Sequence, residues 1–205
     1  LKRMKKYIHL DKKHISCSSN ISCTKLARYL HDNKQPGYEF LYGIPGTIAG
    51  AVSMNAGAFE REIMPYVHSL DLLDENGAIY TLKNDEISYS YRTSNINEKS
   101  IIISVKLFKQ TTNFDMNLLN LLNQKRKISQ PINQLSCGCI FKNPSGDYAA
   151  RLIDSAQLKG SRAGGIYISH KHSNYFINDG SGTYRDFLDL LKRVKEVIAS
   201  EFSVK

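Results

Sequence analysis

Two short segments of this chain combine residue types that can take part in chemistry. Residues 43–51 read Gly-Ile-Pro-Gly-Thr-Ile-Ala-Gly-Ala, and residues 136–144 read Ser-Cys-Gly-Cys-Ile-Phe-Lys-Asn-Pro. Glycine lets the backbone approach a ligand closely, and N–H groups at a helix start favour phosphates. In the second segment the Cys139 thiol lies between a glycine and an apolar pair, followed by Lys142 and Asn143. A weakly acidic hydrogen beside polar anchoring groups suits a proton donor.

The glycine segment also has a purely structural interpretation. Glycine and proline mark most turns, and residues 43–51 lack the G-x-G-x-x-G and Walker spacings of well-known phosphate loops. The short helix that we expect to follow this loop could still bring its first N–H groups to a pyrophosphate or a flat ring.

Arg92 is a second candidate, within the segment Tyr-Ser-Tyr-Arg-Thr-Ser at residues 89–94. A guanidinium can bind a carboxylate through two parallel hydrogen bonds. The alternative is a surface arginine that pairs with an aspartate, and without other information this alternative is the better interpretation.

Cys137 and Cys139 are two residues apart, so on a strand both would lie on one face. A metal would need further ligands, and the other close pair, His170 and His172, does not complete a zinc spacing. One buried cysteine and one functional or inert thiol fits better, so no metal is predicted. The loop 159–165, with Lys159 among its basic residues, could meet phosphates or be a solvated turn.

Composition limits the class of protein. The 205 residues are 41% hydrophobic and 23% charged, which fits one large domain or two small ones. The net charge of +9 suits an anionic partner, but the 12 tyrosines and 8 phenylalanines do not alternate with basic residues, so nucleic-acid binding is weakly supported. Four unevenly spaced cysteines make no disulfide framework, and neither a leader nor a membrane span is recognisable, so we expect a cytoplasmic protein.

Hydrophobic periodicity predicts irregularly alternating strands and helices, so the fold class is α+β. The turn Asp74 to Gly77 should join two strands as a hairpin. Thr183 and Asp186 resemble a capping box at the start of a long amphipathic helix. The predicted strands are one or two edge strands within 2–18, then 67–73, 78–82, a buried strand 101–108, 165–169 and 174–178; the predicted helices are 24–33, a short one through 51–52, 116–128, 147–156 and 183–202.

Together these segments resemble the bacterial UDP-N-acetylenolpyruvoylglucosamine reductases, the flavoenzymes that complete UDP-N-acetylmuramate. The resemblance covers nearly the whole chain and looks like the shorter subtype, which lacks an insertion with a substrate-contacting tyrosine. The blocks that carry it are 39–47, 54–59, Tyr91-Arg92, 138–144, 152–154, 157–160, Lys171-His172 and Asn174.

The resemblance implies two domains: the C-terminal part of an FAD-binding domain at residues 1–110 and a smaller α+β substrate domain at 111–205. The polar break at residues 111–113 marks the expected boundary. The family's reaction implies NADPH, which reduces the flavin, and a UDP-sugar enolpyruvyl ether as substrate. A monomer without nucleic-acid or membrane partners is expected.

The resemblance also assigns roles to individual residues. Arg92 would hold the substrate carboxylate and stabilise the enolate, and Cys139 would donate the proton. Tyr91, Asn143 and Gln157 would contact substrate. The flavin would be lined by Ile44, Pro45, Gly46, Thr47, Gly50, Ser53 and Gly57.

The chain departs from the family pattern in four places. Cys139 stands where the family usually has a serine proton donor, and a thiol, with a pKa of about 8.5, is a competent acid. A Gly-Gly-Gly-Ser-Asn loop that meets the pyrophosphate would lie upstream of Leu1, and a Leu-Glu-Pro-Glu block with a further active-site glutamate would follow Lys205. Ser129 replaces a frequent lysine. We therefore expect a fragment or truncated product of such a reductase.

Two other functions remain open on the sequence alone. The chain could be a non-catalytic remnant that binds a nucleotide sugar through a separately folding domain from about residue 115. A basic nucleic-acid-binding protein is the third alternative.

Overall fold

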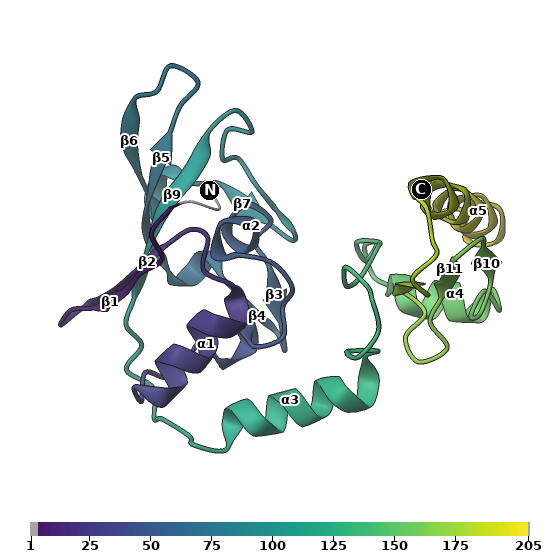
Figure 1. The fold of residues 1–205 in the computed structure, drawn as a ribbon, viewed down its shortest axis with the longest axis horizontal. Coiled ribbons are helices and arrows are strands. Elements are labelled where there is room, and N and C mark those ends of the chain that lie inside the picture. The colour runs from purple at the N-terminus through teal and green to yellow at the C-terminus, as the bar shows by residue number, and fades with distance from the viewer. Residues whose placement is uncertain (1–3, 205) are drawn as a thin grey trace. The chain divides into compact units, whose positions relative to one another are not determined.

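The computed structural model describes residues 4–204, which divide into two compact units between Asn123 and Gln124. Figure 1 shows both, and each is described by itself below. This division falls within helix α3 (Leu118–Ser129). The domain boundary at residues 111–113 stays a prediction.

A five-stranded antiparallel sheet forms the centre of the first unit. Its order is β1-β2-β9-β5-β6, and its strands are β1 (Ile8–Leu10), β2 (His14–Ser18), β9 (Ile101–Phe108), β5 (Val67–Leu73) and β6 (Ile79–Lys83). In β5 and β9, buried residues such as Leu70 and Val105 alternate with more exposed ones, the pattern of strands with one face in a core. The expectation of edge strands within 2–18 is correct for β1 only, because β2 pairs on both sides.

Two helices pack beside this sheet, as Figure 1 shows. Helix α1 (Cys23–Asp32) begins at Ser22, whose side chain accepts a hydrogen bond from the Lys25 N–H, and it buries Leu26 and Leu30. Helix α2 (Ile48–Ser53) begins at Thr47 and buries Ile48, Ala51 and Val52 in the same core. The sequence predicted both helices, α1 from its apolar face and α2 as a short helix after the glycine loop.

Short elements complete the first unit and were not predicted. Three are 3-10 turns, Glu39–Leu41, Met64–Tyr66 and Asn84–Glu86. Two are minimal hairpins, β3 (Gly57–Ala58) with β4 (Arg61–Glu62), and β7 (Tyr89–Ser90) with β8 (Thr93–Ser94). Two-residue strands carry no periodicity that a sequence pattern could reveal.

The second unit packs helices α4 (Ala149–Ser155) and α5 (Tyr184–Phe202) against a three-stranded sheet. Its strands are β10 (Arg162–Ala163), β11 (Ile166–Ile168) and β12 (Phe176–Asn178), in that order. Ile168, Phe176, Leu190 and Val194 lie at the centre of its core. The mixture of helices and antiparallel sheets confirms the α+β class.

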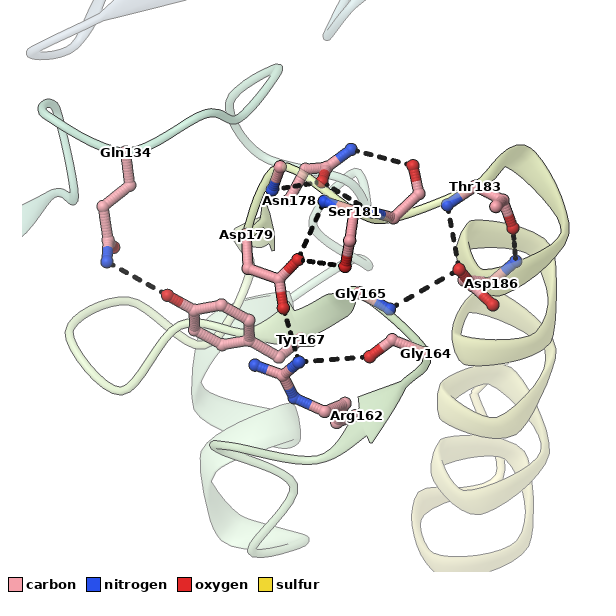
Figure 2. A network of polar contacts seen from close by, with 12 residues as sticks. Gln134, Arg162, Gly164, Gly165, Tyr167, Asn178, Asp179, Ser181, Thr183 and Asp186 are labelled. Atoms are coloured by element: carbon pink, nitrogen blue, oxygen red, sulfur yellow. Dashed lines mark hydrogen bonds and ion pairs between the residues drawn. The ribbon is translucent and has the colours of Figure 1, made fainter.

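Polar contacts at the start of α5 hold the loop after β12 in place (Figure 2). The predicted capping box is confirmed: Thr183 accepts from the Asp186 N–H, and the Asp186 carboxylate accepts from the Thr183 N–H. Asp179 accepts from Ser181 and also pairs with Arg162, with 2.6 Å between Nη1 and Oδ2. Hydrogen bonds from Ser181, followed by the pairing with Arg162, lower the pKa of Asp179 to about 2.

This lowered pKa predicts an acid-sensitive contribution to stability. A carboxyl group whose folded-state pKa is depressed stabilises the fold above its ordinary pKa of 3.8, and the contribution is lost as the pH falls through about 2. Asp179→Asn should therefore lower the unfolding free energy clearly at about pH 6 and much less at about pH 2. Denaturant melts across this range measure it, with the exposed Asp189→Asn on α5 as control. Equal losses at both pH values would contradict the assignment.

Candidate functional site

In the first unit, the candidate flavin residues Gly46, Thr47, Gly50 and Ser53 lie on one exposed face of α2 and the loop before it. Thr47, Gly50 and Ser53 are spaced three apart, which on a helix places them on the same side. A Cβ added at Gly46, where φ is +101°, would meet nothing within 4 Å. The backbone therefore presents a flat, small-residue surface that a planar ring can approach.

The N–H groups at the start of α2 do not serve as the anion site that the sequence suggested. The Ile48 N–H donates to Ile21 O (2.8 Å), the Ala49 N–H to Ser19 O (3.0 Å) and the Gly50 N–H to Thr47 Oγ1. These donors are already satisfied within the protein, so a pyrophosphate would gain no hydrogen bond from them. Of the two possibilities that the sequence left open, a pyrophosphate is disfavoured at these three groups, and approach of a flat ring stays a prediction.

Arg92 lies between β7 and β8 and points at the β3–β4 hairpin. Its Nη1 donates to Asn55 O (3.0 Å) and Glu62 Oε1 (3.0 Å), and its Nη2 donates to Gly57 O (2.8 Å). Among residues 4–204 these bonds leave the Nε–H and one Nη2–H for a ligand. Such a pair of donors can bind a carboxylate through two parallel hydrogen bonds.

Arg92 is held rigidly in this position. Its φ of +56° is left-handed, a conformation that costs a non-glycine residue about 1–2 kcal/mol. Buried Asn55 donates from its side chain to Glu62 Oε2 (2.7 Å), so it orients the carboxylate that pairs with Arg92. The exposed Tyr91 ring lies 4.8 Å from the guanidinium carbon. The acidic partner of Arg92 is thus Glu62 and not an aspartate, and the binding of a carboxylate by Arg92 stays a prediction.

Gly57 and Ser53 link the exposed face of α2 to the two hairpins around Arg92. A Cβ at Gly57 would lie 2.1 Å from Arg61 O, so the tight hairpin requires glycine there. The Ser94 hydroxyl donates to Ser53 O (2.7 Å) and thereby ties the Arg92 hairpin to the end of α2. The predicted flavin face and the predicted carboxylate-binding arginine are thus neighbours within this unit.

In the second unit, Cys139 lies on a segment that runs antiparallel beside β12. The Asn178 N–H donates to Leu135 O (2.9 Å), and the Ile140 N–H donates to Asn174 O (2.9 Å). Leu135 lies opposite Asn178, and Cys139 lies opposite Tyr175, so three residues on one side face two on the other. Between the two bridges this segment has one residue more than its partner, an irregularity like a β-bulge, which is frequent next to active sites. We call residues 135–139 the bulge.

The bulge corrects two expectations about the cysteines. Gly138, within the bulge, has φ +93°, so Cys137 and Cys139 do not follow the alternation of a regular strand. Both thiols are exposed, and neither is the buried cysteine that we expected.

Asn174 fixes the segment just after Cys139. Its buried side chain accepts from the Phe141 N–H (2.9 Å) and donates to Phe141 O (2.9 Å). The Asn174 amide therefore fixes both the N–H and the carbonyl of Phe141. Because Phe141 follows Cys139 by two residues, this restricts the direction of the Cys139 side chain.

Asn143 and Gln157, the predicted substrate residues of this unit, lie at the two ends of α4. Asn143 Oδ1 accepts from the Ala149 N–H (3.1 Å). Gln157 has φ +55° and ends the helix: its N–H donates to Asp154 O and the Leu158 N–H donates to Ile153 O, the pattern of a Schellman motif. Both residues thus have structural partners, and their substrate contacts stay predictions.

Comparison with known proteins decides the family. Residues 130–205 match the model of the UDP-N-acetylenolpyruvoylglucosamine reductase C-terminal domain, and residues 1–83 match that of an FAD binding domain. The reductase of Fusobacterium nucleatum is 34% identical over 204 residues, 100% of this chain and 73% of the relative. The chain belongs to the UDP-N-acetylenolpyruvoylglucosamine reductase family.

Other members of this family are similar to the chain over nearly the same range. The reductase of Caldanaerobacter subterraneus is 38% identical over 194 residues, which are 93% of this chain and 64% of that protein. The reductase of Streptococcus pyogenes is 40% identical over 188 residues, which are 90% of this chain and 63% of that protein. The crystal structure of the Thermus caldophilus reductase superposes with a TM-score of 0.77 at 32% identity, covering 85% of this chain and 65% of that one. The chain thus spans 63% to 73% of the length of these curated relatives.

The residues present fit a flavin. The family match places an FAD-binding domain at residues 1–83, and this range contains the exposed face of Gly46, Thr47, Gly50 and Ser53. Between residues 4 and 204, no three His, Cys, Asp or Glu side chains are grouped so as to hold a metal ion. Within the same range, every helix is too short or too polar to traverse a bilayer.

Glu62, Asn55 and the bulge at Gly138 contact or position the candidate residues, and sequence reasoning missed all three. Glu62 and Arg92 are 30 residues apart, and only the two small hairpins bring them together. The sequence alone does not show which of the acidic residues pairs with Arg92.

The α2 face predicts opposite effects of one substitution on stability and flavin affinity. Gly50 is exposed within a helix, and a Cβ there would meet only Thr47 Oγ1 at 3.9 Å. Gly50→Ala should therefore raise the unfolding free energy by about 0.5–1 kcal/mol. It should weaken FAD binding, because the added methyl group separates the ring from the backbone. Thermal melts and flavin titration measure the two effects; unchanged flavin affinity would argue against this face.

Proposed function

We propose that this chain carries the reaction of its family: reduction of UDP-N-acetylglucosamine enolpyruvate to UDP-N-acetylmuramate with NADPH. Beyond the family match, two observations support this most strongly. The Arg92 guanidinium is fixed by three hydrogen bonds and keeps further N–H donors for a ligand, and the Cys139 thiol is exposed. When bound, FAD supplies the hydride that it has received from NADPH. The protein, as in the sequence-based hypothesis, would act as a cytoplasmic monomer on a small-molecule substrate, without nucleic acid.

Arg92 would bind the substrate carboxylate through its Nε–H and remaining Nη2–H. As the double bond accepts a hydride on one carbon, negative charge spreads toward this carboxylate. A cation already positioned by Glu62 and two backbone carbonyls can stabilise that charge without reorganising. Tyr91 would add contact to the same part of the substrate.

Cys139 would donate the proton to the neighbouring carbon. Its S–H bond breaks, the electron pair stays on sulfur as a thiolate, and the thiolate regains a proton from water. Hydride and proton together saturate the double bond. A thiol is more acidic than the serine hydroxyl of the usual family pattern, so the substitution preserves the role.

A basic hollow in the second unit suits the anionic nucleotide part of the substrate. It measures about 560 Å³, and its lining includes Lys127, Tyr167, His170 and Lys171. Lys171 Nζ donates to Lys127 O, which holds its charge at this hollow. Positive side chains beside an aromatic ring are a suitable surface for a diphosphate and a base.

The two half-reactions of the FAD-loaded chain test this proposal. Cys139→Ala should leave flavin reduction by NADPH unchanged and slow reoxidation by the enolpyruvyl substrate by about 10²–10⁴-fold, the usual contribution of a positioned acid. Cys139→Ser should retain much of the rate, and Cys137→Ala serves as the matched control. Full turnover by Cys139→Ala would contradict the assignment. A colourless chain that binds the UDP-sugar alone would favour the non-catalytic alternative.

A further inference from the structure

Tyr175 lies directly against the cysteine of the bulge. It precedes β12, is 8% exposed and stands opposite Cys139 across the bulged pairing. Its ring packs edge-on against His172, with 4.7 Å between ring centroids. The Ser169 N–H donates to Tyr175 O, so the backbone at Tyr175 is fixed as well.

The Tyr175 hydroxyl is hydrogen-bonded to the Cys139 side chain. Burial, together with the nearby Cys139, raises the pKa of Tyr175 to about 12. The phenol therefore keeps its proton at neutral pH, and toward a sulfur anion it can only act as a donor.

Other titratable and charged groups surround this pair. Arg126 approaches Tyr175 from α3, and Cys137 approaches from the bulge itself. Burial, with a smaller contribution from Lys159, lowers the pKa of His172 and so favours its neutral form. Its Nδ1 accepts from the Asn174 N–H (3.3 Å), which leaves the ring proton on Nε2. Arg126 is thus the positive charge that acts on Tyr175, and its sign favours an anion beside this tyrosine.

We propose that Tyr175 is a positioning residue for Cys139: its O–H donates to the sulfur and stabilises the thiolate that remains after the thiol has lost its proton. The inference rests on the proposed function of Cys139 as proton donor. In this step the S–H bond breaks and the substrate carbon takes the proton, while the O–H bond of Tyr175 stays intact. Tyr175 makes the thiol a stronger acid and holds its sulfur in one direction.

The pH dependence of Cys139 alkylation by iodoacetamide tests this in the full chain, without flavin or substrate. A Cys137→Ser background leaves Cys139 as the exposed thiol, since Cys17 and Cys23 are buried. Tyr175→Phe removes the donor to the thiolate, so the midpoint of alkylation should rise by about one pH unit. Tyr167→Phe is the control, because the Tyr167 hydroxyl accepts from Gln134 instead. An unchanged or lower midpoint in Tyr175→Phe, or an equal rise in the control, would overturn the inference.

A second substitution protects the test against misfolding. Tyr175→3-fluorotyrosine keeps the ring and makes the O–H a stronger donor, so the midpoint should fall; no fall would also overturn the inference. Neither readout depends on turnover. An unchanged midpoint leaves Cys139 as proton donor intact, whereas full turnover by Cys139→Ala removes that role whatever the midpoint does.

Discussion

The bulge at Gly138, with the Asn174 amide beside it, is the constraint on which the proposed chemistry of the second unit depends. In a regular strand, the alternation of side chains between the two faces would decide the direction of the residue 139 side chain. The extra residue and the left-handed glycine break that alternation, and Asn174 then holds Phe141 by both its N–H and its carbonyl. Cys139 is therefore exposed to a ligand while its backbone is fixed on either side.

In the first unit, too, local contacts fix a side chain on irregular backbone, and here that side chain is Arg92. Two hairpins of two-residue strands hold Arg92 against Glu62, Asn55 O and Gly57 O, in a backbone conformation that is unfavourable for arginine. Strain of this kind persists only where the surrounding contacts outweigh it, and it is common at functional sites. In both units the side chain to which we assign a role lies on irregular backbone, and a regular sheet with its core lies beside that backbone.

The sequence predicted the regular elements because their patterns are long and their ends carry signals. β9 is rich in β-branched residues, α5 has a wide apolar stripe, and Thr183 caps its helix as expected. For α1 the sequence offered Ser22 or Thr24 as the cap, and the structure has Ser22. The irregular parts escaped prediction, since hairpins as short as β3–β4 have no period and a bulge depends on its partner strand. The partners of the α2 N–H groups escaped prediction for a similar reason: Ile21 and Ser19, which accept from them, belong to a loop distant in sequence. The roles of Arg92 and Cys139 came from resemblance to the family, and Glu62 became visible only in the structure.

The most direct test of this account is the ratio of the two half-reaction rates in Asn174→Ala, measured with the FAD-loaded chain. Removing the amide leaves the Phe141 backbone groups without their side-chain partner and frees the segment that carries Cys139. We expect reduction of the flavin by NADPH to be unchanged and its reoxidation by substrate to slow by about 100-fold, the cost of misplacing a reacting group by about 1 Å. Reoxidation at the wild-type rate in a folded Asn174→Ala protein would show that the geometry described here does not control the thiol.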